Sequence, residues 1–276
     1  MSYNKFDANV RRRNDRSNRD IKQSNRMREV ANESDDCIVY GRNPVRELLR
    51  SDRTVEKLYI VKGVREGSIS MIVDLAIKRK IPIVEVEKSK LDHMSNGGNH
   101  QSVAAVAAAK EYSTIDDIIS IAKERNQKPL VLILDGIEDP HNLGAIIRIA
   151  ECLGVHGIII PKHRSATLNS VVSKTSAGAI EYVAIAKETN LTDTIKRLKD
   201  EGFWIFGAEA GGTSCYETDF DCSCAIVLGS EGKGISRLVK ENCDYIVSIP
   251  MYGKINSFNV SSAAAIIVSE AARVHN

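Results

Sequence analysis

The chain has 276 residues, of which 43% are hydrophobic and 27% charged, and its 38 basic and 36 acidic side chains leave a formal net charge of +2. This composition is typical of a globular protein and excludes a disordered chain or a collagen-like repeat. The sequence contains no apolar run of the roughly 20 residues that a membrane helix needs, and its start does not resemble a signal peptide. We therefore expect a cytoplasmic protein without a membrane segment.

The six cysteines are consistent with a reducing compartment, because disulfide frameworks are typical of short secreted chains. Cys215, Cys222 and Cys224 lie close together in the sequence. Their C-x-C spacing lacks the paired partner motif that zinc sites use. The sequence therefore predicts no metal site.

Positive charge is concentrated at the N-terminus, where the first 28 residues hold seven Arg and two Lys against three Asp. This stretch has no apolar periodicity that could offset the entropy of ordering it, so we predict a disordered basic arm over 1–36. Such an arm could bind nucleic-acid phosphates with release of counterions, or it could only keep the chain soluble.

Short strands and helices alternate over 37–112, which predicts a compact α/β domain. The expected strands are 38–40, 57–61, 82–86 and 103–108. The expected helices are 41–49, 68–78 and 89–94. A glycine-containing loop over 95–101 precedes the last strand. The segment 113–128 opens with a Ser-Thr cap and is expected to be a linker helix between two domains.

The second half, 129–276, predicts a mostly parallel sheet with helices on both faces. The expected strands are 130–134, 157–160, 182–186, 203–207, 225–228 and 245–249. The expected helices are 143–153, 171–176, 192–200, 235–242 and 260–274. In such folds ligands bind beyond the carboxyl ends of the strands. The fold class is therefore α/β, with two α/β domains.

Polar residues are concentrated in three loops that follow expected strands of the second half. The first loop leads to Asn142, and Arg148 lies beyond it in an otherwise apolar helix. A single Arg in such a helix could pair with a carboxylate or extend to solvent. It could also bind a phosphate through its planar guanidinium.

The second loop, Gly229–Gly234, includes Glu231 and contains three glycines between a strand and a helix. Its spacing fits neither a phosphate-binding loop nor a dinucleotide fingerprint, which argues against a dinucleotide-dependent oxidoreductase. The loop could be simple turn chemistry. The third loop, 250–259, includes Ser257 and Asn259, which could cap the closing helix. Three polar loops beyond strands of one sheet are better explained jointly, as one site.

These segments resemble the three signature motifs of the SpoU/TrmH family of RNA 2′-O-ribose methyltransferases, in the SPOUT superfamily. The motifs are Asn142 to Arg148, 228–234, and 249–253 with 257–261, and the resemblance extends over 129–276 through 164–166 and 176–181. The first half, with Tyr40-Gly41-Arg42 and Asn99-His100-Gln101, is similar to the family's L30e-like RNA substrate-binding domain.

The resemblance implies a C-terminal SPOUT domain with a trefoil knot, a homodimer, and S-adenosyl-L-methionine as cofactor. It implies cofactor contacts from Leu228, Gly229, Ile249, Met251 and Phe258. It implies a catalytic set of Arg148, Asn142, Glu231, Ser257 and Asn259. It implies RNA contacts from Arg42, Asn99, His100 and Gln101. Two positions depart from the family pattern: Phe258 replaces the usual Leu, and Ser102 replaces the usual Gly.

The implied reaction is methylation of a ribose 2′-hydroxyl in structured RNA, and the whole arrangement is most similar to bacterial enzymes that modify a guanosine of 23S rRNA. Alternatives within the family are a tRNA ribose methyltransferase and an rRNA adenosine methyltransferase of the thiostrepton-resistance type. A non-catalytic RNA-binding assembly factor is the alternative from another class. His141 could act as an acid or base, but its position in a turn favours a structural or RNA-contacting role.

Overall fold

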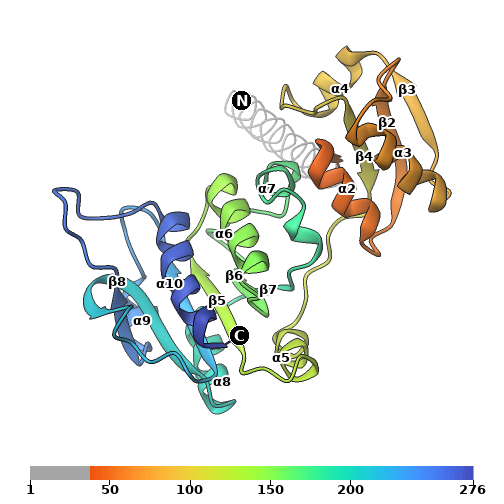
Figure 1. Cartoon of the computed structure of the whole chain (residues 1–276). Coiled ribbons are helices and arrows are strands. Elements are labelled where there is room, and N and C mark those ends of the chain that lie inside the picture. Colours follow the sequence, from red (N-terminus) through yellow and green to blue (C-terminus); the bar gives the residue numbers. More distant parts are fainter. Residues whose placement is uncertain (1–37, 276) are drawn as a thin grey trace, which may run out of the picture.

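The computed structural model describes residues 38–275, which form two β-sheets with their own helices (Figure 1). The predicted basic arm over 1–36 lies outside the described residues. In the described part of the chain, no helix is both long and apolar enough to cross a membrane.

The first sheet is mixed and has the strand order β1-β4-β2-β3. Its strands are β1 (Ile38–Tyr40), β2 (Val55–Val61), β3 (Ile83–Val86) and β4 (Val103–Ala107). Its helices are α2 (Arg42–Arg50), α3 (Ser68–Lys78) and α4 (Lys88–Met94). Strand β4 runs antiparallel to both neighbours, whereas β2 and β3 are parallel. Each predicted element of this half is present.

The main core of this domain lies between the sheet and helices α2 and α3, and it includes Leu48, Leu58 and Ile72, all fully buried. A smaller cluster around Leu91 of α4 covers the opposite face. The antiparallel pairing sets Tyr40, at the end of β1, opposite Ala104, at the start of β4. The turn after β1 and the loop before β4 are therefore neighbours.

The second sheet is parallel throughout and has the strand order β10-β8-β9-β5-β6-β7. Its strands are β5 (Leu130–Asp135), β6 (Gly157–Pro161), β7 (Ile185–Glu188), β8 (Trp204–Ser214), β9 (Cys224–Gly229) and β10 (Tyr245–Ser248). Its helices are α5 (Ile115–Glu124), α6 (Pro140–Cys152), α7 (Ser170–Thr175), α8 (Leu191–Asp200), α9 (Arg237–Glu241) and α10 (Val260–His275), with a 3-10 turn η1 (Ala179–Glu181). The predicted parallel α/β sheet is confirmed.

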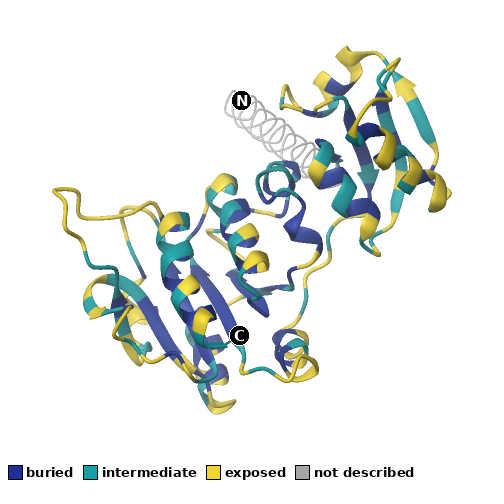
Figure 2. Cartoon of the chain, in the orientation of Figure 1, coloured by how far each residue is buried: buried dark blue, intermediate teal, exposed yellow. Residues whose placement is uncertain are grey.

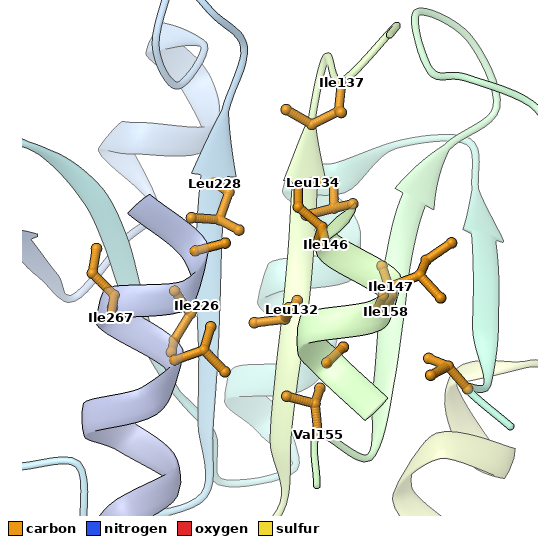
Figure 3. Close-up of a cluster of buried hydrophobic side chains, with 14 of the residues drawn as sticks. Leu132, Leu134, Ile137, Ile146, Ile147, Val155, Ile158, Ile226, Leu228 and Ile267 are labelled. Atoms are coloured by element: carbon orange, nitrogen blue, oxygen red, sulfur yellow. The ribbon is translucent and has the colours of Figure 1, made fainter. Parts of the chain in front are cut away.

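Apolar layers cover both faces of this sheet. Helices α6 and α10 pack on one face, where Leu132, Ile146 and Ile267 share one core cluster (Figure 3). Helices α5, α8 and α9 cover the other face. Because Ile115 and Ile118 of α5 are buried in this second layer, the helix between the two sheets is also part of the second domain's core.

Two strands differ from their predicted bounds. Strand β7 begins at Ile185 rather than at 182, because Gly178, with φ +94°, starts the η1 turn and Tyr182 caps it. Strand β8 continues to Ser214 rather than ending at 207. Its glycines, which resemble a strand end in sequence, allow close approach instead: a Cβ at Gly212 would lie 2.1 Å from the carbonyl oxygen of Ile246 in β10.

Candidate active site

The three polar loops leave the parallel sheet at its carboxyl edge, after β5, β9 and β10. Parallel strands end at the same edge, so segments far apart in the sequence meet there. The first loop leads into α6, where the Asp139 side chain accepts from the backbone N–H of His141 at 2.9 Å. The third loop is exposed over 251–259 (Figure 2). Backbone topology therefore gathers the three sequence motifs.

Asn142, Glu231 and Asn259 form one hydrogen-bonded trio, with one residue from each loop. The Asn142 Nδ2 donates to Glu231 Oε1 at 3.1 Å, and Asn259 Nδ2 lies 3.0 Å from Asn142 Oδ1. The Asn259 amide also donates to Glu231 Oε1. This clustering supports the interpretation of the three loops as a single site.

Helix α10 fixes the orientation of Asn259. Its Oδ1 accepts from the backbone N–H of Ser261 at 2.9 Å and from the Ser261 hydroxyl at 2.6 Å. The side chain thus caps the helix, as the simpler sequence interpretation suggested. Since its oxygen is engaged in the cap, its NH₂ group is directed to Glu231 and Asn142, so the same residue does both jobs.

The glycines of the second loop are required by backbone packing. Ser230 and Gly234 exchange backbone hydrogen bonds of 3.1 and 2.9 Å, which closes the loop on itself. A Cβ added at Gly229 would lie only 2.2 Å from the carbonyl carbon of Gly234. Any side chain at Gly229 would therefore open the loop that presents Glu231.

A cavity of about 770 Å³ lies beside this loop, between β8, β9, β10 and the start of α10. All five predicted cofactor residues line it: Leu228, Gly229, Ile249, Met251 and Phe258. Glu231, Ser257 and Asn259 line it as well. A second hollow, of about 410 Å³, adjoins the first and is lined by Asn142, Glu231 and Arg164. Glu231 therefore stands at the boundary between the two.

Arg148 and Ser257 are not part of the trio. Arg148 is exposed on α6, and within residues 38–275 it forms no ion pair or hydrogen bond. Ser257 is exposed at the cavity lining. Both side chains are accessible to a ligand that enters from solvent.

The predicted RNA-binding residues gather where β1 and β4 meet. Gln101 Oε1 accepts from the backbone N–H of Arg42 at 3.1 Å, and its carbonyl accepts from Arg42 Nε at 3.3 Å. Asn99 is exposed. Gln101 and Ser102 both have positive φ, at 51° and 70°. Such a conformation costs energy in non-glycine residues, and it is found where the surroundings enforce it.

His100 holds this loop from inside. The residue is 5% exposed, its Nε2 lies 3.0 Å from Asp92 Oδ1, and its Nδ1 accepts from the Ser102 backbone N–H at 3.0 Å. It enforces the strained Ser102 conformation where the family usually has glycine. Direct RNA contact is therefore better suited to its exposed neighbours Asn99 and Gln101.

Glu209 is a site residue that the sequence did not reveal. It lines the large cavity from β8, and its Oε1 pairs with Lys240 Nζ at 2.7 Å. Its Oε2 is buried and has no hydrogen-bond partner in the described part of the chain. A buried oxygen without a partner is costly and marks a position where a ligand donor would be stabilised. The Gly-rich context of Glu209 gave no signal of this position.

The remaining histidines and cysteines do not form a second site. His141 is exposed, 3.4 Å from the Thr175 hydroxyl. His156 is buried between the Leu130 backbone N–H and Gln127 Oε1, and burial lowers its pKa to about 4, so it is neutral. Cys224 Sγ lies 3.6 Å from His275 Nε2. Among residues 38–275, no group of three His, Cys, Asp or Glu side chains could hold a metal ion.

Comparison with known protein families defines the class of this site. The family model described as "SpoU rRNA Methylase family" matches residues 129–269, and the model for RNA 2′-O ribose methyltransferase substrate binding matches residues 38–113. The first match contains the trio and the cavity, and the second contains Arg42 and Gln101. The class is an RNA methylase with a substrate-binding domain.

Similar proteins agree with this class. YacO of Bacillus subtilis, named as a TrmH family tRNA/rRNA methyltransferase, is 44% identical over 239 residues, which cover 86% of this chain and 96% of YacO. A Staphylococcus aureus protein of the same description is 46% identical over 87% of this chain and 96% of its own length. The chain therefore belongs to the SpoU/TrmH family of RNA methyltransferases.

Solved structures agree on the fold. A Porphyromonas gingivalis protein described as a TrmH family RNA methyltransferase is 28% identical, with a TM-score of 0.69 over 86% of this chain and 89% of that one. The SpoU methyltransferase AviRb of Streptomyces viridochromogenes, solved with AdoMet, is 22% identical with a TM-score of 0.70 over 86% of this chain and 89% of that one. At that identity the second similarity shows the fold.

Proposed function

We propose that this chain transfers a methyl group from S-adenosyl-L-methionine to a ribose 2′-hydroxyl of structured RNA, with a guanosine of 23S rRNA as the target. The observation that carries the proposal is the trio of Asn142, Glu231 and Asn259 at the rim of the large cavity. Family membership supports the reaction class, and the substrate-binding domain supports RNA as the partner.

The cavity lining fits the cofactor. Leu228, Ile249 and Phe258 offer apolar surface to an adenine ring, and the missing side chain of Gly229 keeps backbone groups accessible. Glu209 Oε2 would accept a hydrogen bond from a cofactor donor, which would satisfy its buried oxygen. When bound, the cofactor supplies an electrophilic methyl carbon on a positively charged sulfur.

The residues around the cavity mouth would align the weakly nucleophilic hydroxyl, and alignment of this kind supplies much of the rate. Asn142 and Asn259 hold the Glu231 carboxylate in place through their amides. Arg148 would bind the adjacent phosphate and stabilise the developing alkoxide. An Arg side chain, with a pKa above about 12, is poorly suited to act as the base.

We further propose a homodimer, a trefoil knot around the cofactor cavity, an L30e-like first domain and a cytoplasmic location, all from the family resemblance. The sequence suggested that 263–267 could pack against a second copy. Ala264 and Ile267 are instead buried in the chain's own core, and Ala263 lines the cavity. A dimer contact would therefore use other surfaces of α10.

Transfer of labelled methyl groups to RNA tests the function. The protein is incubated with labelled S-adenosylmethionine and with separate pools of rRNA and tRNA that lack the modification, and the nucleosides are then analysed. We expect labelled 2′-O-methylguanosine in 23S rRNA. Label in tRNA, or in 2′-O-methyladenosine of rRNA, would correct the target. Cofactor binding without transfer to either pool or to ribosomal assembly particles would favour the non-catalytic alternative.

A further inference from the structure

The two domains meet along the segment 174–182, which lies against α2 and the loop that follows it (Figure 1). Backbone fit is close: Gly178 has φ +94°, and a Cβ there would lie 2.7 Å from the Cβ of Glu47. A larger residue at Gly178 would push the domains apart.

A buried ion pair lies at the centre of this contact. Arg53 Nη1 of the first domain is 2.8 Å from Glu181 Oε1 of the second, and the side chains are only 10% and 1% exposed. The Ser51 hydroxyl lies 3.4 Å from Glu181 Oε2. An ion pair sealed from water depends strongly on both partners, since removal of one leaves a buried charge uncompensated.

Both partners are fixed by their surroundings. Arg79 donates to the carbonyls of Ser51 and Arg53, each at 2.8 Å, and so holds the loop that carries Arg53. Arg53 Nε also donates to the carbonyl of Ala108 at 2.6 Å. Lys110, in the connection between the domains, donates to the Glu181 carbonyl at 3.3 Å, and burial lowers its pKa.

Further contacts flank the ion pair. The Tyr182 hydroxyl donates to Glu47 Oε2 at 2.7 Å, and burial together with this hydrogen bond raises the Tyr182 pKa to about 12. Lys174 Nζ donates to Gln101 Oε1 at 3.1 Å, so the contact extends to the predicted RNA-binding loop.

The same segment packs against the helix that carries Asn142 and Arg148. A Cβ at Gly144 of α6 would lie 2.7 Å from Thr175 Cβ and 3.0 Å from the Val172 carbonyl oxygen, and the Thr175 hydroxyl contacts His141. One short segment therefore touches the substrate-binding domain on one side and the catalytic helix on the other.

We propose that Glu181 is a positioning residue: its ion pair with Arg53 fixes the substrate-binding domain relative to α6, so that RNA held at Arg42 and Gln101 reaches the catalytic trio. The proposal rests on the proposed function for the role of the RNA. The domain arrangement itself can be tested without any RNA.

The experiment compares Glu181→Gln with Glu87→Gln in the full-length protein. Glu87 also pairs with a cation at 2.8 Å, but its side chain is 72% exposed, so it is a matched control. Limited trypsin digestion reports on the joint through the appearance of the fragment that begins at Glu111, after cleavage at Lys110. Calorimetric titration gives the S-adenosylmethionine Kd, and methyl transfer gives kcat and KM for RNA.

We expect Glu181→Gln to accelerate cleavage at Lys110 by about tenfold and to lower kcat/KM for RNA by about tenfold, with the cofactor Kd within about twofold of wild type. Arg53→Met should reproduce both effects, and Arg53→Lys, which keeps the charge, should restore part of each. Glu87→Gln should change neither.

Unchanged cleavage in Glu181→Gln and Arg53→Met would overturn the proposal, as would faster cleavage with normal kcat/KM. Weakened cofactor binding would also overturn it, because the residue would then act on the catalytic domain as a whole. If the wild-type protein methylates no RNA, the proposed function fails, and the cleavage rates and RNA-binding affinities of the variants decide the positioning role.

Discussion

The two sheets assemble their polar residues by different topological routes. In the parallel sheet, loops after β5 and β9 share one edge, which brings together Asn142 and Glu231, 89 residues apart. In the mixed sheet, the antiparallel β1–β4 pair brings the turn after one strand beside the loop before another, and Arg42 meets Gln101. The first route gathers several motifs around a cavity, whereas the second makes a local surface. Catalysis therefore belongs to the parallel sheet, and substrate contact to the mixed one.

Arg148→Ala gives the largest effect and tests the catalytic half of this division. We expect methyl transfer to fall by about 10²–10³, the range for loss of one group that stabilises developing charge. The cofactor Kd, measured by calorimetry, should stay within about twofold. Arg237→Ala, at an exposed α9 position paired with Glu241, is the control and should keep full activity. A large loss of cofactor affinity in Arg148→Ala would contradict its assigned role.

Gly229→Ala tests whether the closed second loop is needed for the cavity. The added Cβ would clash with Gly234, so the loop would open and S-adenosylmethionine affinity should fall by about 10–100-fold, equivalent to about 1–3 kcal/mol of overpacking. Gly253→Ala, in the third loop, has no atom within 4 Å of the new Cβ and should bind normally. Equal affinities in titrations of the two variants would show that the loop does not shape the cofactor site.

His156 makes the stability of the parallel sheet dependent on pH. Its pKa is lowered to about 4 in the folded chain and is about 6.5 when unfolded, so the unfolded state binds more protons between these values. This contribution is complete above pH 7 and is lost as the pH falls towards 4, by on the order of 2 kcal/mol. Urea unfolding of wild type and His156→Gln should differ in pH slope within this window. Parallel slopes would exclude the histidine as the cause.

Arg42→Ala gives the smallest effect and tests the mixed sheet as a substrate surface. We expect KM for RNA to rise by about tenfold, with kcat and cofactor Kd nearly unchanged, because loss of one contact weakens binding by about 1–3 kcal/mol. Arg65→Ala, at an exposed residue of the same domain paired with Glu85, is the control. A fall in kcat alone would move Arg42 from substrate binding to catalysis.

Strand and helix positions were predictable because apolar periodicity is local, and so were the three loops, since each follows a strand. The start of β7 was not predictable, because Tyr182 pairs with Glu47, 135 residues away, rather than continuing a strand. The Glu209 position also depends on distant packing, since its surroundings come from β9 and the Gly234 loop. The residues of the trio came from a family resemblance, and their hydrogen bonds required the three-dimensional structure.

The most direct test of the central claim is where the methyl group is attached. RNA labelled by the wild-type protein is hydrolysed in alkali, which cleaves after every nucleotide with a free 2′-hydroxyl. Ribose 2′-O-methylation predicts that the label remains in alkali-resistant dinucleotides and that Arg148→Ala removes it. Label recovered in mononucleotides would place the methyl group on a base and would contradict the account.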